Sequence, residues 1–323
     1  MKTLPYRIDV HHHIVPVDYI TGLEKIGITN ALGRAFPEWS AEISLDLMDA
    51  NGIMTAVTSL SSPGVFFGDV QHSIRLARMC NEISAKLISD YPERFGAFAT
   101  LTLPDVKVSL NELAYAFDTL KLDGVVLMSN YSGQYIGDKE FKELYAELNK
   151  RRAVVYVHPT DPVGGNPLGQ EMPTFLMEVT FETARVIFNL LYKGVLEQYP
   201  DIKWIFSHAG GVMPYIAWRI SLGQFIIPDA SKTIPKGVLC YLKNIFYDTG
   251  LSANPHALSS LQELVEPSQI LFGTDYPFAP DLVTVETVKG LRTYRGFSPE
   301  EIDAIEFRNA LNLFPRLKEI YEK

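Results

Sequence analysis

Short apolar segments alternate with longer helical patterns eight times along the 323-residue chain. The segments are rich in β-branched residues and apolar on both faces, which is typical of strands in a buried parallel sheet. Each is followed by a helical stretch of roughly 10–20 residues, the alternation that parallel α/β folds need to return the chain to the same edge. The predicted strands are 8–10, 56–60, 95–100, 124–128, 153–157, 203–206, 245–247 and 270–272.

Eight such units with uniform composition favour a closed (β/α)8 barrel, a TIM barrel, over an open sheet. No low-complexity segment or Gly/Ser linker divides the chain, so we predict a single domain over 1–323. Segments 27–41 and 160–173 are rich in glycine and proline, and we expect them to be loops inserted at the barrel mouth. The predicted helices between the first six strands are 44–51, 71–90, 106–121, 138–151 and 176–198.

The composition argues against several classes of partner. A net charge of −9 disfavours a nucleic acid, and no Lys/Arg cluster suggests an anionic membrane surface. No apolar run approaches the ~18–20 residues of a membrane span, and the start at Met1–Arg7 lacks the apolar stretch of a signal peptide. Cys80 and Cys240 are too few for a disulfide framework. We therefore expect a soluble cytoplasmic protein with reduced cysteines.

Histidines gather where the first predicted strand ends, in the run Asp9-Val10-His11-His12-His13. Side chains alternate between the two faces along a strand. His11 and His13 therefore share one face and can bind the same ion. His12 points the other way and is not an expected ligand.

Three later strands also end in a histidine or an aspartate. His158 closes the fifth strand in VHP, His208 the sixth in SHAGG, and Asp275 the eighth in GTDYP. Catalytic groups of α/β barrels lie at this edge of the sheet. Any one of these residues has an ordinary structural explanation, but their joint occurrence at successive strand ends favours a functional site.

We expect His11, His13, His158 and Asp275 to bind one divalent metal ion. Three imidazoles and one carboxylate leave coordination positions open for water or substrate, as in a catalytic rather than a structural metal site. Zinc is the expected ion because the ligands are mostly imidazoles, and manganese is the alternative because mixed nitrogen and oxygen sites also take it.

The motifs DxHxH, VHP, SHAGG and GTDYP resemble those of the amidohydrolase superfamily. More narrowly, they are similar to its aminocarboxymuconate-semialdehyde decarboxylase branch, which contains the γ-resorcylate, 5-carboxyvanillate and 6-methylsalicylate decarboxylases. The resemblance spans residues 6–315 and includes MDANGI and LEQYPDIKWIFSHAGG. The 6-methylsalicylate decarboxylase-like group is the most similar, especially in SLSSPGVFFGD and NYSGQYIGD.

The resemblance implies a role for each residue of the site. It makes His11, His13 and His158 metal ligands, and it makes Asp275 a ligand that also handles a proton. It makes His208 an acid/base or a group that polarises substrate or water. The fourth strand ends in Val126-Leu127-Met128 and lacks the lysine of binuclear members, so one ion is expected. The family also implies a homodimer or homotetramer.

One departure from the branch concerns the arginines that hold substrate carboxylates. The first is expected after a W-D-P-E-V segment, which here reads Trp39-Ser40-Ala41-Glu42-Ile43 followed by Ser44. The second, lent by the partner subunit, aligns near Pro228. Two missing arginines predict an aromatic monocarboxylate rather than a dicarboxylate.

The sequence thus predicts a metal-dependent, non-oxidative decarboxylase of a small hydroxybenzoate-like or enol acid. The alternative is a hydrolase of the lactonase or amidohydrolase type that uses a metal-activated water, because the same ligand set serves both. Arg219 and Arg185 could each pair with a substrate carboxylate or form a surface ion pair. Candidate ring-packing residues are Trp39, Phe66, Phe67, Tyr131, Phe181 and Phe278.

Overall fold

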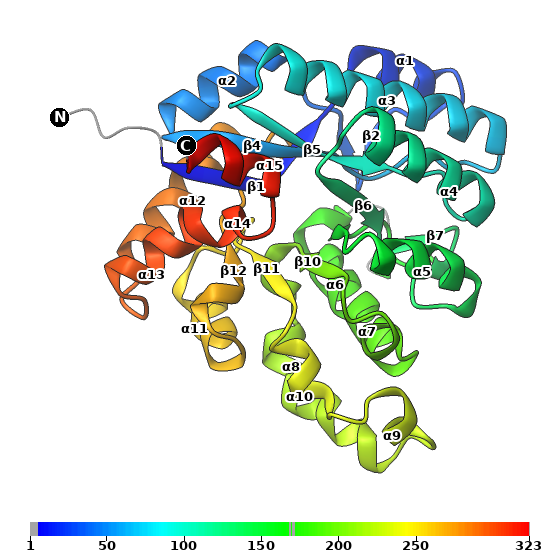
Figure 1. Ribbon diagram of the computed structural model, residues 1–323, viewed down its shortest axis with the longest axis vertical. Coiled ribbons are helices and arrows are strands. Elements are labelled where there is room, and N and C mark those ends of the chain that lie inside the picture. Colours follow the sequence, from blue (N-terminus) through cyan, green and yellow to red (C-terminus); the bar gives the residue numbers. More distant parts are fainter. Residues whose placement is uncertain (1–5, 168, 170–171, 323) are drawn as a thin grey trace.

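The eight predicted strands form one parallel sheet in the computed structural model, which describes residues 6–167, 169 and 172–322 (Figure 1). Each strand pairs with the next along the chain, as a barrel of βα units requires. The predicted boundaries agree with the observed ones to within a few residues. In order, the strands are β1 (Arg7–Ile14), β4 (Ile53–Leu60), β5 (Phe95–Thr100), β6 (Gly124–Met128), β9 (Val154–His158), β10 (Lys203–Phe206), β11 (Phe246–Asp248) and β12 (Ile270–Leu271).

The first and last strands meet and close the barrel. The Val10 N–H donates to the Phe272 carbonyl at 2.9 Å, and the Asp275 N–H donates to the His11 carbonyl at 2.7 Å. The second bond lies past the end of β12, in the segment that carries the GTDYP motif. Closure therefore places the end of the eighth strand directly beside the histidines of the first, and the predicted (β/α)8 fold is confirmed.

Helices surround the sheet and link its strands (Figure 1). The predicted helix 106–121 is α-helical to Ala114 and ends in a π-helical turn at Tyr115–Thr119. The predicted helix 176–198 is broken at Gly194, whose φ of +78° favours glycine. The helices are α1 (Val17–Glu24), α2 (Ala41–Ala50), α3 (Val70–Asp90), α4 (Val106–Ala114), α5 (Lys142–Lys150), α6 (Thr174–Tyr192), α7 (Val195–Gln198), α8 (Met213–Ser221), α9 (Ala230–Thr233), α10 (Val238–Leu242), α11 (Pro255–Leu264), α12 (Asp281–Thr293), α13 (Pro299–Asp303), α14 (Asn309–Leu311) and α15 (Pro315–Tyr321).

Two short hairpins occupy regions between the barrel strands. The predicted loop 27–41 contains β2 (Asn30–Ala31) and β3 (Arg34–Ala35), and the segment after β6 contains β7 (Asn130–Tyr131) and β8 (Gln134–Tyr135). The predicted loop 160–173 includes positions 168, 170 and 171, which lie outside the described residues, as do 1–5 of the N-terminal segment and 323.

Large aromatic side chains fill the barrel interior. Phe98 stacks on Tyr156 with ring centroids 5.2 Å apart, and Phe206 and Phe272 are also fully buried. Both cysteines are free thiols. None of the described helices is both long enough and apolar enough to cross a lipid bilayer.

Candidate metal centre

Three imidazoles and one carboxylate meet at the carboxyl edge of the sheet. One ligand atom each of His11, His13, His158 and Asp275 lies within 4.8 Å of all the others, and all four residues are buried. The Nε2 atoms of His11 and His13 are 3.1 Å apart, and Asp275 Oδ1 lies 3.1 Å from each. The structure therefore brings together the four residues that the strand-end pattern predicted as ligands.

Two of the imidazoles are held from behind by residues on other strands. His11 Nδ1 lies 2.9 Å from Asp248 Oδ2, and His13 Nδ1 lies 3.0 Å from the Ser59 hydroxyl. An acceptor at Nδ1 keeps the proton there and leaves the lone pair of Nε2 facing the cluster. This is the tautomer that a metal ion requires.

His158 provides the test of whether the site fits an ion. Its Nδ1 lies 2.8 Å from the Pro159 carbonyl, so its Nε2 again faces the cluster. That Nε2 is buried and has no hydrogen-bond partner among the described residues. An unpartnered buried imidazole nitrogen is costly, and a divalent cation bound there would satisfy it. The donor set thus fits a metal ion.

The charges of the site also favour a bound metal ion. Burial lowers the pKa of His11, but the carboxylates of Asp248 and Asp275 outweigh burial and raise it from 6.5 to about 10. Burial lowers the pKa of both His13 and His158, and for His158 the neighbouring imidazoles lower it further. Burial would raise the pKa of Asp275, yet His11 and the other histidines hold it well below its usual range. A proton on His11 thus balances the carboxylates of Asp248 and Asp275 only in part, and one divalent cation could take the place of that proton.

Asp248 is a functional residue that the sequence reasoning missed. It ends β11 and accepts hydrogen bonds from the Tyr156 hydroxyl at 3.0 Å, the His208 N–H at 2.9 Å and the Gly250 N–H at 2.8 Å. A Cβ at Gly250 would come within 2.6 Å of His11 Nδ1, so the backbone can approach only as glycine. The available signal was the strand-end aspartate in FYDTG, which occupies the same edge as the other motifs.

His208 and Asp275 face each other across the cluster. His208 Nε2 lies 3.3 Å from Asp275 Oδ2, the oxygen that does not face His11 and His13. Both residues have a left-handed backbone, with φ of 55° and 66°, and Ala209 follows at 56°. Non-glycine residues rarely adopt this conformation, and such strain concentrates at functional sites. Each Asp275 oxygen thus has its own set of partners.

His12 lies on the opposite side of β1, as strand alternation predicts. Its Nδ1 is 3.1 Å from Asp9 Oδ2 and its Nε2 is 3.0 Å from the Ser44 hydroxyl. Asp9 also accepts from the Thr274 hydroxyl at 2.7 Å and from the His11 N–H at 3.0 Å. The Asp9 carboxylate therefore joins the ends of the first and eighth strands beneath the cluster.

A cavity of about 220 Å³ opens beside the cluster and is lined by His158, His208 and Asp275. Its remaining walls are mostly apolar, and they include Phe175, Val179, Leu251, Phe278 and Val283. This volume suits a single substituted ring rather than a large ligand.

Arg34 also lines the cavity, although the sequence analysis did not single it out. It lies on the β2–β3 hairpin, donates to the Phe278 carbonyl at 2.6 Å, and packs over the Phe175 ring at 4.9 Å. Arg219 and Arg185 were the arginines that the sequence suggested, because only the folded hairpin brings Arg34 to the cavity.

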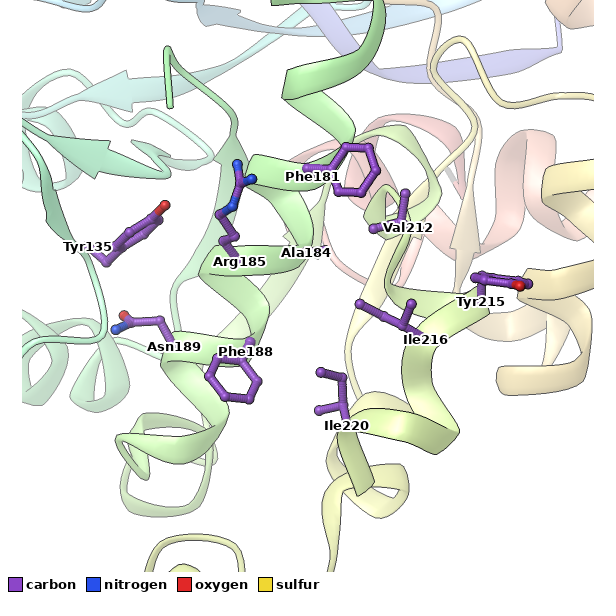
Figure 2. Close-up of a pocket in the computed structure, with 10 residues that line it drawn as sticks. All are labelled: Tyr135, Phe181, Ala184, Arg185, Phe188, Asn189, Val212, Tyr215, Ile216 and Ile220. Atoms are coloured by element: carbon purple, nitrogen blue, oxygen red, sulfur yellow. The ribbon is translucent and has the colours of Figure 1, made fainter. Parts of the chain in front are cut away.

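The structure brings few of the predicted substrate residues to this cavity. Phe278 lines it, with its ring 5.6 Å from that of His13. Phe181 instead lines a separate groove between α6 and α8 (Figure 2). Tyr131 is buried with its hydroxyl on the Met128 N–H, and Arg219 is exposed on α8.

Two other predicted aromatic residues, Trp39 and Phe67, pack elsewhere. Trp39 donates its indole N–H to the Ser44 hydroxyl at 2.9 Å, and Phe67 packs against the hydrophobic core. Aromatic side chains are used mostly for packing, so their presence near a motif does not place them at the substrate.

Sequence comparisons with known proteins place the chain in a family. The family model described as amidohydrolase matches residues 8–316. The 6-methylsalicylic acid decarboxylase of Penicillium expansum is 34% identical over 322 residues, covering 98% of each chain. The chain belongs to the amidohydrolase family. Its predicted resemblance to the 6-methylsalicylate decarboxylase group is thereby confirmed.

Solved structures support the fold of this amidohydrolase. A crystal structure of an amidohydrolase II is 30% identical, with a TM-score of 0.89, and covers 95% of this chain and 99% of that chain. A 5-carboxyvanillate decarboxylase from Novosphingobium aromaticivorans has a TM-score of 0.85 at 20% identity, covering 97% of this chain and 96% of its own. The latter was crystallised with manganese and a nitrobenzoic acid.

The raised pKa of His11 predicts how the metal-free amidohydrolase responds to pH. Because the folded value of about 10 exceeds the ordinary 6.5, this contribution to stability is fully present below pH 6.5 and lost as pH rises through about 10. We expect the Tm of chelator-treated protein to fall between about pH 7 and about pH 10. The metal-loaded protein is the control. Its bound ion replaces the proton on His11, so we expect its Tm to fall less over the same pH range. Equal pH dependence of the two forms in thermal unfolding would contradict the charge balance described above.

Proposed function

We propose that this amidohydrolase is a metal-dependent carboxy-lyase that removes CO₂ from a small aromatic acid with a hydroxyl group ortho to the carboxylate. The observation that carries the proposal is the position of the His3Asp cluster, which forms one wall of a small apolar cavity that also holds one arginine. Full-length similarity to a 6-methylsalicylic acid decarboxylase supports this substrate class.

His11, His13, His158 and Asp275 would hold one divalent ion. When bound, the ion supplies positive charge that orients the substrate oxygens and stabilises a phenolate. Three imidazoles suit zinc, whereas the related 5-carboxyvanillate decarboxylase was crystallised with manganese. Elemental analysis of the purified protein decides between Zn²⁺ and Mn²⁺, and a protein without any bound or activating metal would contradict the assignment.

Arg34 and the apolar walls would position the substrate. Arg34 is part of the cavity lining, where its guanidinium could pair with a carboxylate or another anionic substituent. The Phe278 ring and the side chains of Val179 and Leu251 offer packing surfaces for the aromatic ring. A ring held between these groups presents one face to Asp275.

Asp275 would move the proton. Its low pKa makes it a carboxylate when the substrate binds, so it first accepts the proton of the substrate hydroxyl. It then donates this proton to the ring carbon that bears the carboxylate, while His208, 3.3 Å from Oδ2, steadies that oxygen. The C–C bond breaks, its electron pair restores the aromatic ring, and CO₂ leaves. Protonation before cleavage avoids an aryl carbanion.

The protein would act as a homodimer, or as a homotetramer built from such dimers. Helix α8, which lines the groove of Figure 2, and the segment after it carry exposed large apolar side chains: Tyr215 is 86%, Trp218 69%, and Phe225 and Ile226 are each 78% exposed. Several exposed large apolar side chains close together in the chain support a protein interface here. Light scattering with a monomer mass at micromolar concentration would contradict this assembly.

A parallel screen tests the proposed reaction. We expect salicylate-type acids to release CO₂ in the presence of Zn²⁺ or Mn²⁺, because their adjacent carboxylate and hydroxyl groups match the cluster and Asp275. Benzoates without the ortho hydroxyl are the matched control and should be inert. Lactones, esters and amides are assayed beside them. Hydrolysis of these compounds without CO₂ release from any acid would replace the decarboxylase with the metal-dependent hydrolase.

The substitution Asp275→Asn tests the proton transfer. At saturating metal, with metal content measured in each sample, we expect kcat to fall by roughly 10²–10⁴-fold because an amide cannot carry the proton. Near-wild-type turnover by the metal-loaded variant would remove Asp275 from this role.

The substitution Arg34→Met tests substrate binding, whereas Asp275→Asn tests proton transfer. It keeps the proton chemistry but removes the charge from the cavity, so KM should rise by roughly 10- to 100-fold, with a smaller change in kcat. A drop in kcat alone would mean that Arg34 does not hold the substrate in the ground state.

A further inference from the structure

Glu182 is a fully buried carboxylate on α6 that the proposed reaction does not use. Its Oε1 accepts hydrogen bonds from the Tyr135 hydroxyl at 2.6 Å and from Arg185 Nη1 at 3.0 Å. Its Oε2 accepts from the Ser129 hydroxyl at 3.2 Å and from Asn130 Nδ2 at 3.3 Å. The carboxylate therefore fixes four donors, of which two come from the residues immediately after strand β6.

Those two residues hold the segment that begins at His158. The Ser129 N–H donates to the His158 carbonyl at 2.9 Å, and the Thr160 N–H donates to the Ser129 hydroxyl oxygen at 3.2 Å. Asn130 Nδ2 also donates to the Asp161 carbonyl at 3.1 Å. Three contacts in four residues thus attach the end of β9 to the end of β6.

His158 depends on this attachment more than the other two imidazoles do. His11 and His13 are held at Nδ1 by Asp248 and Ser59, which lie on other strands. The Nδ1 of His158 contacts the carbonyl of Pro159, the next residue in its own chain segment. Its orientation is therefore only as well defined as the position of that segment.

We propose that Glu182 is a positioning residue that acts through Ser129 and Asn130 to hold His158 for metal binding. The proposal rests on the metal centre of the proposed function. Each Glu182 oxygen accepts two hydrogen bonds, so the arrangement uses both oxygens as acceptors. Residues behind metal-ligating histidines commonly change metal affinity when they are replaced.

Arg185 makes the buried charge tolerable. Its side chain is 44% exposed and projects from α6 on the side of the groove where Tyr135 also lies (Figure 2). A buried carboxylate needs such a partner because desolvation of an isolated charge is costly. Of the two alternatives for Arg185, the structure therefore shows the ion pair rather than a contact in the substrate cavity.

Glu182→Gln is the central variant because it keeps the size of the side chain while replacing one acceptor oxygen with a donor. That NH₂ group would face Asn130 Nδ2 or Arg185, both of which can only donate. With Zn²⁺ and a chromophoric chelator in competition, we expect the metal dissociation constant to rise roughly 10-fold. Any fall in activity should be recovered by excess metal, which a merely unstable protein would not show.

Glu178→Gln is the matched control. Glu178 lies one turn earlier on α6, is also buried, and has a carboxylate oxygen 3.8 Å from Arg185 Nη1. Among the described hydrogen bonds it has none with Ser129 or Asn130. We expect this variant to bind Zn²⁺ as the wild type does, so an equal loss in both variants would assign the effect to α6 in general and overturn the proposal.

A double-substitution cycle identifies the route of the effect. Ser129→Ala, which removes a single hydroxyl, should weaken Zn²⁺ binding by itself. The double variant Ser129→Ala/Glu182→Gln should lose less affinity than the two single variants lose in sum. In a His158→Ala background, Glu182→Gln should cause no further loss, because the residue it positions is gone. An undiminished loss in that background, or Zn²⁺ affinity unchanged in both Glu182→Gln and Ser129→Ala, would overturn the proposal. If the wild type itself binds no metal, the metal centre fails and the role of Glu182 fails with it.

Discussion

The site depends on the balance of charge between two buried carboxylates and three imidazoles. Asp248 and Asp275 are buried, and their charge must be balanced locally because the desolvation of an isolated charge costs too much free energy. A proton on His11 can supply that balance, and a divalent ion supplies it better because it also satisfies the free Nε2 of His158. The barrel contributes by closing β1 against the segment after β12, which brings Asp275 to the histidines.

The strands and the loops contribute different parts of the site. Ligands come from the ends of strands, where the sheet fixes the backbone and leaves little freedom. The cavity wall comes largely from loops and helix starts: Arg34 from a hairpin, Phe278 from the segment after β12, and Phe175 from the first turn of α6. In barrels of this type, the strand ends preserve the chemistry while the loops change the substrate.

The sequence predicted the barrel and the cluster because both depend on local patterns. Strand alternation placed His11 and His13 on one face, and the βα repeat ordered the remaining motifs. It did not predict Arg34, because only the folded hairpin brings that residue over the mouth. Nor did it single out Glu182, whose partners lie about 50 residues earlier in the chain. Aromatic residues such as Phe181 were placed by type, and residue type does not determine which cavity a side chain lines.

The central claim is that one divalent ion in the His3Asp cluster is required for decarboxylation. The most direct test is a titration of chelator-treated protein with Zn²⁺ or Mn²⁺, in which bound metal and CO₂ release from a salicylate-type acid are measured together. We expect activity to rise in proportion to occupancy and to reach its maximum at one ion per chain. Full activity in protein shown to be free of metal, or a maximum that requires two ions per chain, would contradict it.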